Sequence, residues 1–447
     1  MSGTDAIGVT GVFALLVTLV VLLRQWQTRH APAPEVVRKS LHVAMGVATL
    51  SFPWLFDSVW AVVVLAVLSA LFLTAIERLP RWRDSLGQVV AGVQRRSWGT
   101  LFFALAVASV FAMSDGDPLL YCVPVAMLTF GDSLAALVGR RFGMVKFQTG
   151  EGRKSWEGAG AMFAVTFLVV LTGLLLWPPV GMEWMGKLLA ALMMGLVGMA
   201  VEAVSWRGLD NLFLPLLGHV FLKTFVELEA TGLALRLVVL VALLFFTVRQ
   251  RTQQFVLRDN ARIGTALFLY VAFAVGGWQW FLPPLALLLL YVRFIPFDYE
   301  VEKNKYSFEA VLAVVGPGLV WLLLYREWPL DEFFLPYLFA FAASLAVIWL
   351  ARIKHNGRPK GGAVALARAA SPPAGLMLAA MGWLLWDEAR LGWVLGAALG
   401  ALLLACGAVW WRRDGGGHAD TREWDWACRG GWVLAGSALV YAARAGF

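Results

Sequence analysis

The sequence predicts an all-α fold, a polytopic transmembrane helical bundle of about 14–16 spans. Of the 447 residues, 60% are hydrophobic and only 15% are charged, whereas a soluble domain is nearer half apolar and a quarter charged. The mean hydropathy is +0.72. Apolar stretches long enough to cross a bilayer, roughly 17–25 residues each, recur from one end of the chain to the other. Their continuous rather than alternating pattern excludes a transmembrane β-barrel.

The apolar stretches fall into two successive series. Residues 1–250 are expected to form one membrane domain of about nine spans, and residues 251–447 an additional one of about seven. The first series lies near 7–24, 42–56, 59–76, 99–113, 118–138, 158–177, 185–204, 210–228 and 231–248. The second lies near 262–280, 282–295, 308–325, 333–351, 364–386, 391–411 and 430–445.

The loops between these spans alternate in charge. Basic residues gather near 24–39, 78–96, 140–154, 249–262 and 352–360, whereas the opposite loops are mostly acidic, near 115–117, 183, 327–332 and 387–388. By the positive-inside rule, the basic loops face the cytoplasm and both termini face outward. The net charge of +8 is therefore explained by membrane topology, and no nucleic-acid partner is expected.

A carboxylate lies inside one of the predicted spans, in the stretch TFGDSLAALVGRRFG (129–143). Asp132 is about two helical turns from the cytoplasmic exit at Arg140 and Arg141, roughly 10 Å at 1.5 Å per residue. A charge at this depth is costly unless it is paired or hydrated, so it indicates function by default. The helical face of Asp132 also contains Ala135, Ala136 and Gly139. Small residues permit the close approach of another backbone or a ligand.

Two further cytoplasmic segments carry polar residues of a phosphate-binding kind. In RKSLHV (38–43), Arg38 and His42 are four residues apart and share a helix face, and Lys39 lies beside them. In TGEGRKSWEGAG (149–160), a Gly-rich turn and two cations precede a helix start, which together suit a phosphate. Its candidate residues are Gly150, Gly152, Arg153, Lys154, the expected N-cap Ser155 and Glu157. The segment is not a Walker A motif, because Arg153 rather than Gly precedes the lysine and no strand is expected to lead in.

Two more acidic positions are expected at a similar depth. Glu202 lies near the inner end of its span, with Gly195 and Gly198 on the same face, so the carboxylate is expected to face a close helix contact or a cleft. Asp210 and Asn211 begin the next apolar stretch. Together with Asp132, these oxygen ligands suit Mg²⁺, which takes one or two carboxylates plus substrate phosphates. Basic residues of the neighbouring loops would bind the phosphates themselves.

Each of these features also has a purely structural interpretation. Arg38 and Lys39 are equally well explained as a topogenic signal, His42 as an interfacial histidine, and the glycines as a loop turn. Intramembrane Asp132 and Glu202 are harder to explain in this way, because a structural role still requires a partner for each. A membrane transporter is the main rival from another class, although its site usually lies near the bilayer midplane between paired repeats.

The blocks RKSLH, FGDSLAALVGRRFG, KSWEG and VEAVSWRGLDNLFLP, in this order within residues 35–225, resemble the CTP-dependent polyprenol kinase family, which includes dolichol kinase and phytol kinase. The pair GDSLAALVGRRFG and RKSWEG is also similar to the phosphatidate cytidylyltransferase pattern. The later K-R-x-x-K-D-F and G-H-G-G region of that group is absent from the sequence. The resemblance therefore favours phosphorylation over CDP-lipid synthesis, which stays open as the alternative.

The resemblance implies that Asp132 helps to bind the nucleotide and its metal. Lys154, Ser155 and Glu157 would belong to the CTP-handling turn, and Glu202, Asp210 and Asn211 would complete the polar site. Arg38, Lys39 and His42 match the N-terminal block of the family. The candidate catalytic residues are thus Asp132, Glu202 and Lys154, and either carboxylate is a candidate general base.

The expected reaction is transfer of the γ-phosphate of CTP to a lipid alcohol, with Mg²⁺ as cofactor, at the cytoplasmic membrane edge. The acceptor is left open among polyprenol, phytol and similar lipids, and the choice of CTP over ATP depends on the resemblance alone. Residues 251–447 show none of the four blocks. For them we expect a helical extension that packs against the first domain or shapes a lipid entrance, rather than a second kinase.

Overall fold

The computed structural model describes residues 2–79, 82, 98–149, 152–249, 257–294, 306–355 and 423–444. Within these residues the predicted all-α membrane fold is confirmed, because nine helices are long and apolar enough to cross a membrane. The described part divides into two compact units, residues 1–238 and 239–447, and the division falls inside helix α13 (Ala230–Arg249). The predicted spans near 364–386 and 391–411 lie outside the described residues.

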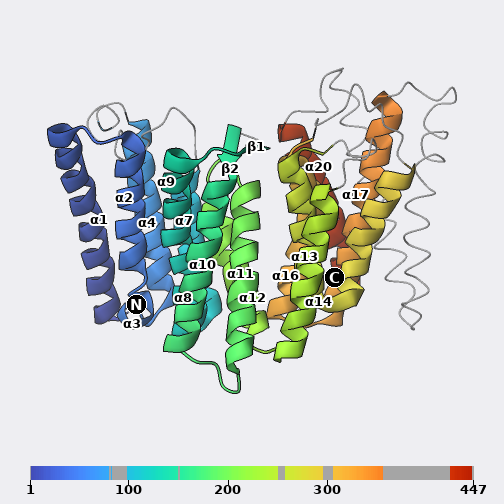
Figure 1. Cartoon of the computed structure of the whole chain (residues 1–447), viewed down its shortest axis with the longest axis horizontal. Coiled ribbons are helices and arrows are strands. Elements are labelled where there is room, and N and C mark those ends of the chain that lie inside the picture. Colours follow the sequence, from blue (N-terminus) through green and yellow to red (C-terminus); the bar gives the residue numbers. More distant parts are fainter. Residues whose placement is uncertain are drawn as a thin grey trace. The chain divides into compact units, whose positions relative to one another are not determined.

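The first unit is a bundle of helices that alternate in direction along the chain (Figure 1). Helix α10 packs between α9 and α11, and α12 packs against α7 and α11. Because the directions alternate, the starts of α2, α10 and α12 and the ends of α9 and α11 come to one end of the bundle. The helices are α1 (Gly3–His30), α2 (Pro34–Thr49), α3 (Phe52–Leu55), α4 (Val59–Arg78), α7 (Gly99–Ser114), α8 (Pro118–Ala126), α9 (Ser133–Phe142), α10 (Trp156–Leu176), α11 (Trp184–Val204) and α12 (Asp210–Phe225).

Several helix boundaries differ from the apolar stretches. Helix α1 begins at Gly3, because Ser2 and Asp5 form a reciprocal capping box, which satisfies backbone donors at the helix start. The stretch 42–56 belongs to two helices: α2 begins eight residues earlier, with Pro34 in its first turn, and ends at Thr49. A polar first turn is invisible to a search for apolar runs, so the sequence places the start of α2 too late.

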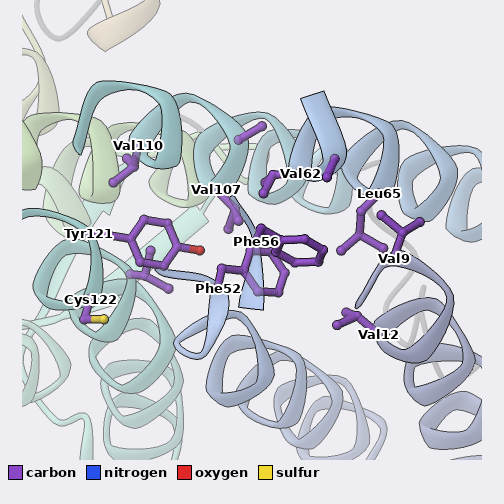
Figure 2. Packing of buried hydrophobic residues seen from close by; sticks show 13 residues of the cluster. Val9, Val12, Phe52, Phe56, Val62, Leu65, Val107, Val110, Tyr121 and Cys122 are labelled. Atoms are coloured by element: carbon purple, nitrogen blue, oxygen red, sulfur yellow. The ribbon is translucent and has the colours of Figure 1, made fainter. Parts of the chain in front are cut away.

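An apolar cluster joins the helices at the end of the first unit opposite to the starts of α2, α10 and α12 (Figure 2). Phe52 of α3 and Phe56, which follows that helix, pack edge to face with ring centroids 5.0 Å apart, between Val9 of α1 and Tyr121 of α8. The Tyr121 hydroxyl donates to the carbonyl of Thr49 (3.1 Å), which would otherwise be an unpaired group at the end of α2. Such close packing matters because lipid removes the hydrophobic driving force between helices.

The second unit contains α14 (Asp259–Phe294), α16 (Phe308–Glu327), α17 (Phe334–His355) and α20 (Glu423–Arg444). Helix α14 is interrupted at Gly277, which has φ 75°. Phe273 and Phe281 lie on either side of it with ring centroids 5.9 Å apart, whereas eight residues of straight helix would separate them by about 12 Å. The chain therefore reverses at Gly277, as two separate predicted spans near 262–280 and 282–295 require.

Candidate functional site

Asp132 lies at the end of a π-helical turn, Met127–Asp132 (η1), that connects α8 to α9. The wider turn is rare and frequently found at functional sites. Gly131 lies within it, and a Cβ there would approach the sulfur of Met162 to 2.6 Å, so a larger residue would require the Met162 side chain to move. The sequence indicates the buried carboxylate but not the π turn, because both helix types show the same apolar pattern.

Lys39 of α2 pairs directly with Asp132. Its Nζ donates to Asp132 Oδ2 at 2.5 Å, and the two side chains are only 4% and 9% exposed. His42 Nε2 lies 3.6 Å from the same oxygen. Helix α2 comes this close because Gly46 faces Thr129, where any Cβ would lie 2.2 Å from the hydroxyl. Lys39 therefore occupies the interior of the bundle, a position that a purely topogenic lysine does not need.

The small-residue face predicted beside Asp132 contacts α10. A Cβ added at Gly158 would lie 2.9 Å from the carbonyl oxygen of Ala135 and 3.2 Å from the Cα of Gly139. The backbones of α9 and α10 are therefore in contact, as small residues permit between membrane helices.

Gly158→Ala is expected to destabilise the protein, because the new methyl group meets backbone atoms that cannot move independently. Overpacking of this kind costs about 1–3 kcal/mol. Gly160→Ala, two residues along the same helix, is the matched control, since its Cβ has nothing within 4 Å and alanine favours the helix by about 1 kcal/mol. Thermal unfolding in one detergent compares them, and equal midpoints for the two variants would contradict the close contact.

A short antiparallel hairpin precedes α10. Strand β1 (Lys146–Thr149) pairs with β2 (Gly152–Ser155), and β2 continues directly into the helix. The expectation that no strand leads in is therefore wrong: four residues are too few for a visible apolar alternation. The exclusion of a Walker A motif stands, because Arg153 still precedes Lys154. Gly150 lies outside the described residues.

The hairpin is attached to the start of α10 by two side chains. Ser155 is the predicted N-cap, and its Oγ accepts from the backbone N–H of Gly158 at 3.1 Å. Glu157 Oε1 accepts from the backbone N–H of Val145, also at 3.1 Å. Glu157 thus positions the hairpin, and any contact with a nucleotide stays a prediction.

Lys154 pairs with Glu202 of α11. Its Nζ donates to Glu202 Oε1 at 2.8 Å and also to the backbone carbonyl of the same residue. Burial lowers the pKa of Lys154, but the negative charges of Glu202, Asp210 and Asp132 together with the hydrogen bond to Glu202 outweigh burial and raise the pKa, so the lysine stays charged. Helix α11 lies close to α10 because a Cβ at Gly198 would lie 2.9 Å from the Thr166 hydroxyl, which is the close helix contact expected for that face.

Three carboxylates converge between these two lysines. One oxygen each of Asp132, Glu202 and Asp210 lies within 4.8 Å of the others. Three carboxylates against two ammonium groups leave one net negative charge when all are ionised. Glu202 Oε2 is buried and has no hydrogen-bond partner among the described residues. A surplus of hard, partly unpaired oxygen ligands fits a divalent cation such as Mg²⁺.

The loop before α12 places Asp210 in this group. Arg207 (φ 50°) and Gly208 (φ 83°) both take left-handed backbone conformations, which turn the chain sharply. The side-chain Nδ2 of Asn211 donates to the backbone carbonyl of Gly99 at 2.8 Å, so Asn211 attaches α12 to the start of α7. This contact differs from the metal ligation predicted for Asn211, which stays a prediction.

The remaining predicted cations lie around the edge of the three carboxylates rather than among them. Arg38 forms a two-pronged ion pair with Glu35, with Nη2 2.6 Å from Oε1, and the i, i+3 spacing of the two residues could have revealed it. Arg140, Arg141 and Arg153 are exposed. The sequence indicates where the charged residues of the site lie but not their partners. It predicts neither the pairing of Arg38 with Glu35 nor that of Lys39 with Asp132.

Comparison with known proteins gives relatives of one kind. No protein-family model matches the chain, and no solved structure matches it. The phytol kinase of Synechocystis sp. is 32% identical over 212 residues, which are 46% of this chain and 86% of that protein. Phytol kinase 1 of Arabidopsis thaliana chloroplasts is 30% identical over 125 residues, and the probable chloroplast phytol kinase of Triticum aestivum is 28% identical over 123. Each plant match covers 26% of this chain, and 40% and 41% of those proteins respectively.

Proposed function

Because the chain belongs to the phytol kinase family and is a lipid-alcohol kinase, we propose that it transfers the γ-phosphate of CTP to a polyprenol, phytol or similar lipid alcohol at the cytoplasmic edge of the membrane. The observation that carries this proposal is the convergence of Asp132, Glu202 and Asp210 within 4.8 Å, between two paired lysines. Phosphoryl transfer needs this combination, since it depends mainly on positioning and on neutralising phosphate charge.

The proposed metal is Mg²⁺, bound by Asp132, Glu202 and Asp210. When bound, it would neutralise charge on the transferring phosphate. One divalent ion added to the net charge of −1 leaves the group at +1, which favours a polyphosphate ligand. Lys39 and Lys154 each lie within hydrogen-bond distance of a ligating carboxylate, so both are placed to bind phosphate oxygens at its border.

The acceptor hydroxyl needs a group that takes its proton. Asp132 and Glu202 are the two candidates, because both are carboxylates at the site and both come from helices that line the same end of the bundle. A general base must lie within hydrogen-bond reach of the proton that it removes. Glu202 Oε2 has no partner among the described residues, which favours Glu202 for this role and Asp132, paired with Lys39, for binding.

The position of the carboxylates near helix ends supports a reaction between a nucleotide from water and an alcohol whose tail stays in lipid. Asp132 lies about three turns from the end of α9, and Asp210 is the first residue of α12. A nucleotide would arrive from water past the exposed Arg140, Arg141 and Arg153, while the apolar tail of the alcohol stays in lipid. Membrane lipids are thus expected partners, and the positive-inside pattern predicts that this end is cytoplasmic.

The test is a transfer assay with the full chain in lipid nanodiscs. CTP or ATP labelled in the γ-phosphate is supplied with Mg²⁺ and with polyprenol, phytol, diacylglycerol or phosphatidate. We expect label in a lipid monophosphate, and more from CTP than from ATP. Labelling from ATP alone would overturn the assignment of CTP as the phosphate donor. Release of pyrophosphate with formation of a CDP-lipid from phosphatidate would show that the protein is a cytidylyltransferase rather than a kinase. No transfer with any pair would overturn the proposal.

A further inference from the structure

The second unit contains an apolar cavity that is open on one side. Both halves of α14 line it, through Phe268 and Leu287, and so do Val311 of α16 and Phe341 of α17. These residues come from four helical segments that pack together within one unit. The cavity is therefore a property of the second unit by itself.

The polar side chains of this cavity gather towards one end. Tyr306 lies just before α16, Tyr291 is one turn before the end of α14, and Arg429 is about two turns into α20. Phe268 lies deeper, nine residues after the start of α14, or about 14 Å at 1.5 Å per residue. The cavity thus has a polar end and an apolar interior, the pattern of a site for an amphiphile.

The volume of the cavity is sufficient for part of a hydrocarbon chain. The centre of a water-sized sphere has about 90 Å³ in which to move. At about 10–15 Å³ for one water-sized group, this space accommodates roughly six to nine such groups. A segment of a hydrocarbon chain therefore fits within the cavity.

We propose that this cavity binds the hydrocarbon chain of a single-chain lipid alcohol, with its hydroxyl head near Tyr306 and Arg429, and so collects the acceptor for the kinase. The inference extends the proposed function, because it assigns part of the acceptor binding to the second unit. A phospholipid shares the hydrocarbon chemistry, and competition with excess phosphatidylcholine distinguishes it from a single-chain alcohol. The basic residues near 249–262 are expected, by the positive-inside rule, on the same side of the membrane as the loops of the carboxylate site.

The experiment uses phytol that carries a photoreactive diazirine and an alkyne tag in its chain, with the full protein in phosphatidylcholine nanodiscs. Mass spectrometry of labelled peptides locates the probe. Val311→Trp fills the cavity, and Val320→Trp on the same helix is the matched control, because Val320 is 40% exposed and does not line the cavity. Thermal unfolding confirms that both variants fold.

We expect labelling of α14 and α16, loss of that labelling on addition of unlabelled phytol, and persistence with excess phosphatidylcholine. Val311→Trp should reduce the labelling and raise KM for the alcohol roughly fivefold to tenfold, with KM for the nucleotide unchanged, while Val320→Trp changes neither. Labelling confined to the first unit, or equal in both variants, would overturn the inference. Displacement by phosphatidylcholine alone would also overturn it and identify an ordinary lipid site.

The labelling also separates this inference from the proposed function. Binding of the probe requires no phosphate donor. Cavity labelling that Val311→Trp removes, in a protein without any transfer activity, would defeat the proposed reaction and leave the cavity site standing. Transfer activity without labelling of the cavity would support the proposed reaction and overturn the cavity site.

Discussion

Asp132→Asn should reduce the rate of phosphate transfer roughly 1,000-fold, which corresponds to about 4 kcal/mol of transition-state stabilisation. The substitution keeps the shape of the side chain but removes the charge that is proposed to bind the metal. It also leaves Lys39 buried without a counter-charge, since the pair is 2.5 Å apart and less than a tenth exposed, and such a loss costs about 3 kcal/mol of stability. The initial rate at saturating CTP and alcohol, and the thermal unfolding midpoint, measure the two effects.

The two effects are separated by a second substitution. Lys39→Met combined with Asp132→Asn removes both charges, so the unfolding midpoint should return towards that of the unchanged protein. The rate should stay low, because the metal ligand is still missing. Recovery of the rate in the double variant would mean that Asp132 serves only to pair with Lys39. Asp132→Asn with more than a tenth of the original rate would exclude it from the metal site.

Glu202→Gln should weaken the apparent affinity for Mg²⁺ by about 10–100-fold and lower the rate even at saturating Mg²⁺. Glutamine cannot supply the negative charge that lies within 4.8 Å of Asp132 and Asp210. It also removes the charge that pairs with Lys154 at 2.8 Å. A titration of the transfer rate against Mg²⁺ concentration separates the loss of metal affinity from the loss of a general base. A weaker affinity is overcome by more metal, whereas a lost general base is not.

Glu183→Gln is the matched control for this variant. Glu183 is the exposed residue at the opposite end of the same helix, before the first turn of α11. We expect its Mg²⁺ dependence and its rate to match those of the unchanged protein. An unchanged Mg²⁺ dependence in Glu202→Gln would remove Glu202 from the proposed metal ligands, whatever happened to the maximal rate.

The positions of the site residues were predictable because burial of charge in a membrane is costly wherever it occurs. Asp132 and Glu202 interrupt apolar stretches, so they are visible without a structure, and Asp210 begins the next one. Their partners were not predictable in the same way. Lys39 and Asp132 are 93 residues apart in the chain, and nothing local indicates which of the neighbouring cations reaches the carboxylate.

The local backbone at the site was likewise hidden. The π turn before α9 and the hairpin before α10 each involve only a few residues, too few to alter a periodic pattern. The glycines near the carboxylates predicted helix contacts correctly. Gly139, near Asp132, and Gly198, near Glu202, were expected where helices approach closely, and both lie at such contacts. The structural roles of Glu157 and Asn211, which attach loops and helix starts, were not separable from ligand binding by sequence.

The sequence by itself determined the membrane fold and the positions of the acidic residues along its helices, because these depend on hydrophobicity and charge, which are properties of each segment alone. The kinase family likewise follows from sequence, through similarity to known phytol kinases. Only the tertiary structure decided that the three carboxylates meet within 4.8 Å, that Lys39 and Lys154 pair with two of them, and that the second unit contains a cavity. Those features arise where helices distant in the chain pack against one another, and packing depends on side-chain shape at contacts that no single segment encodes.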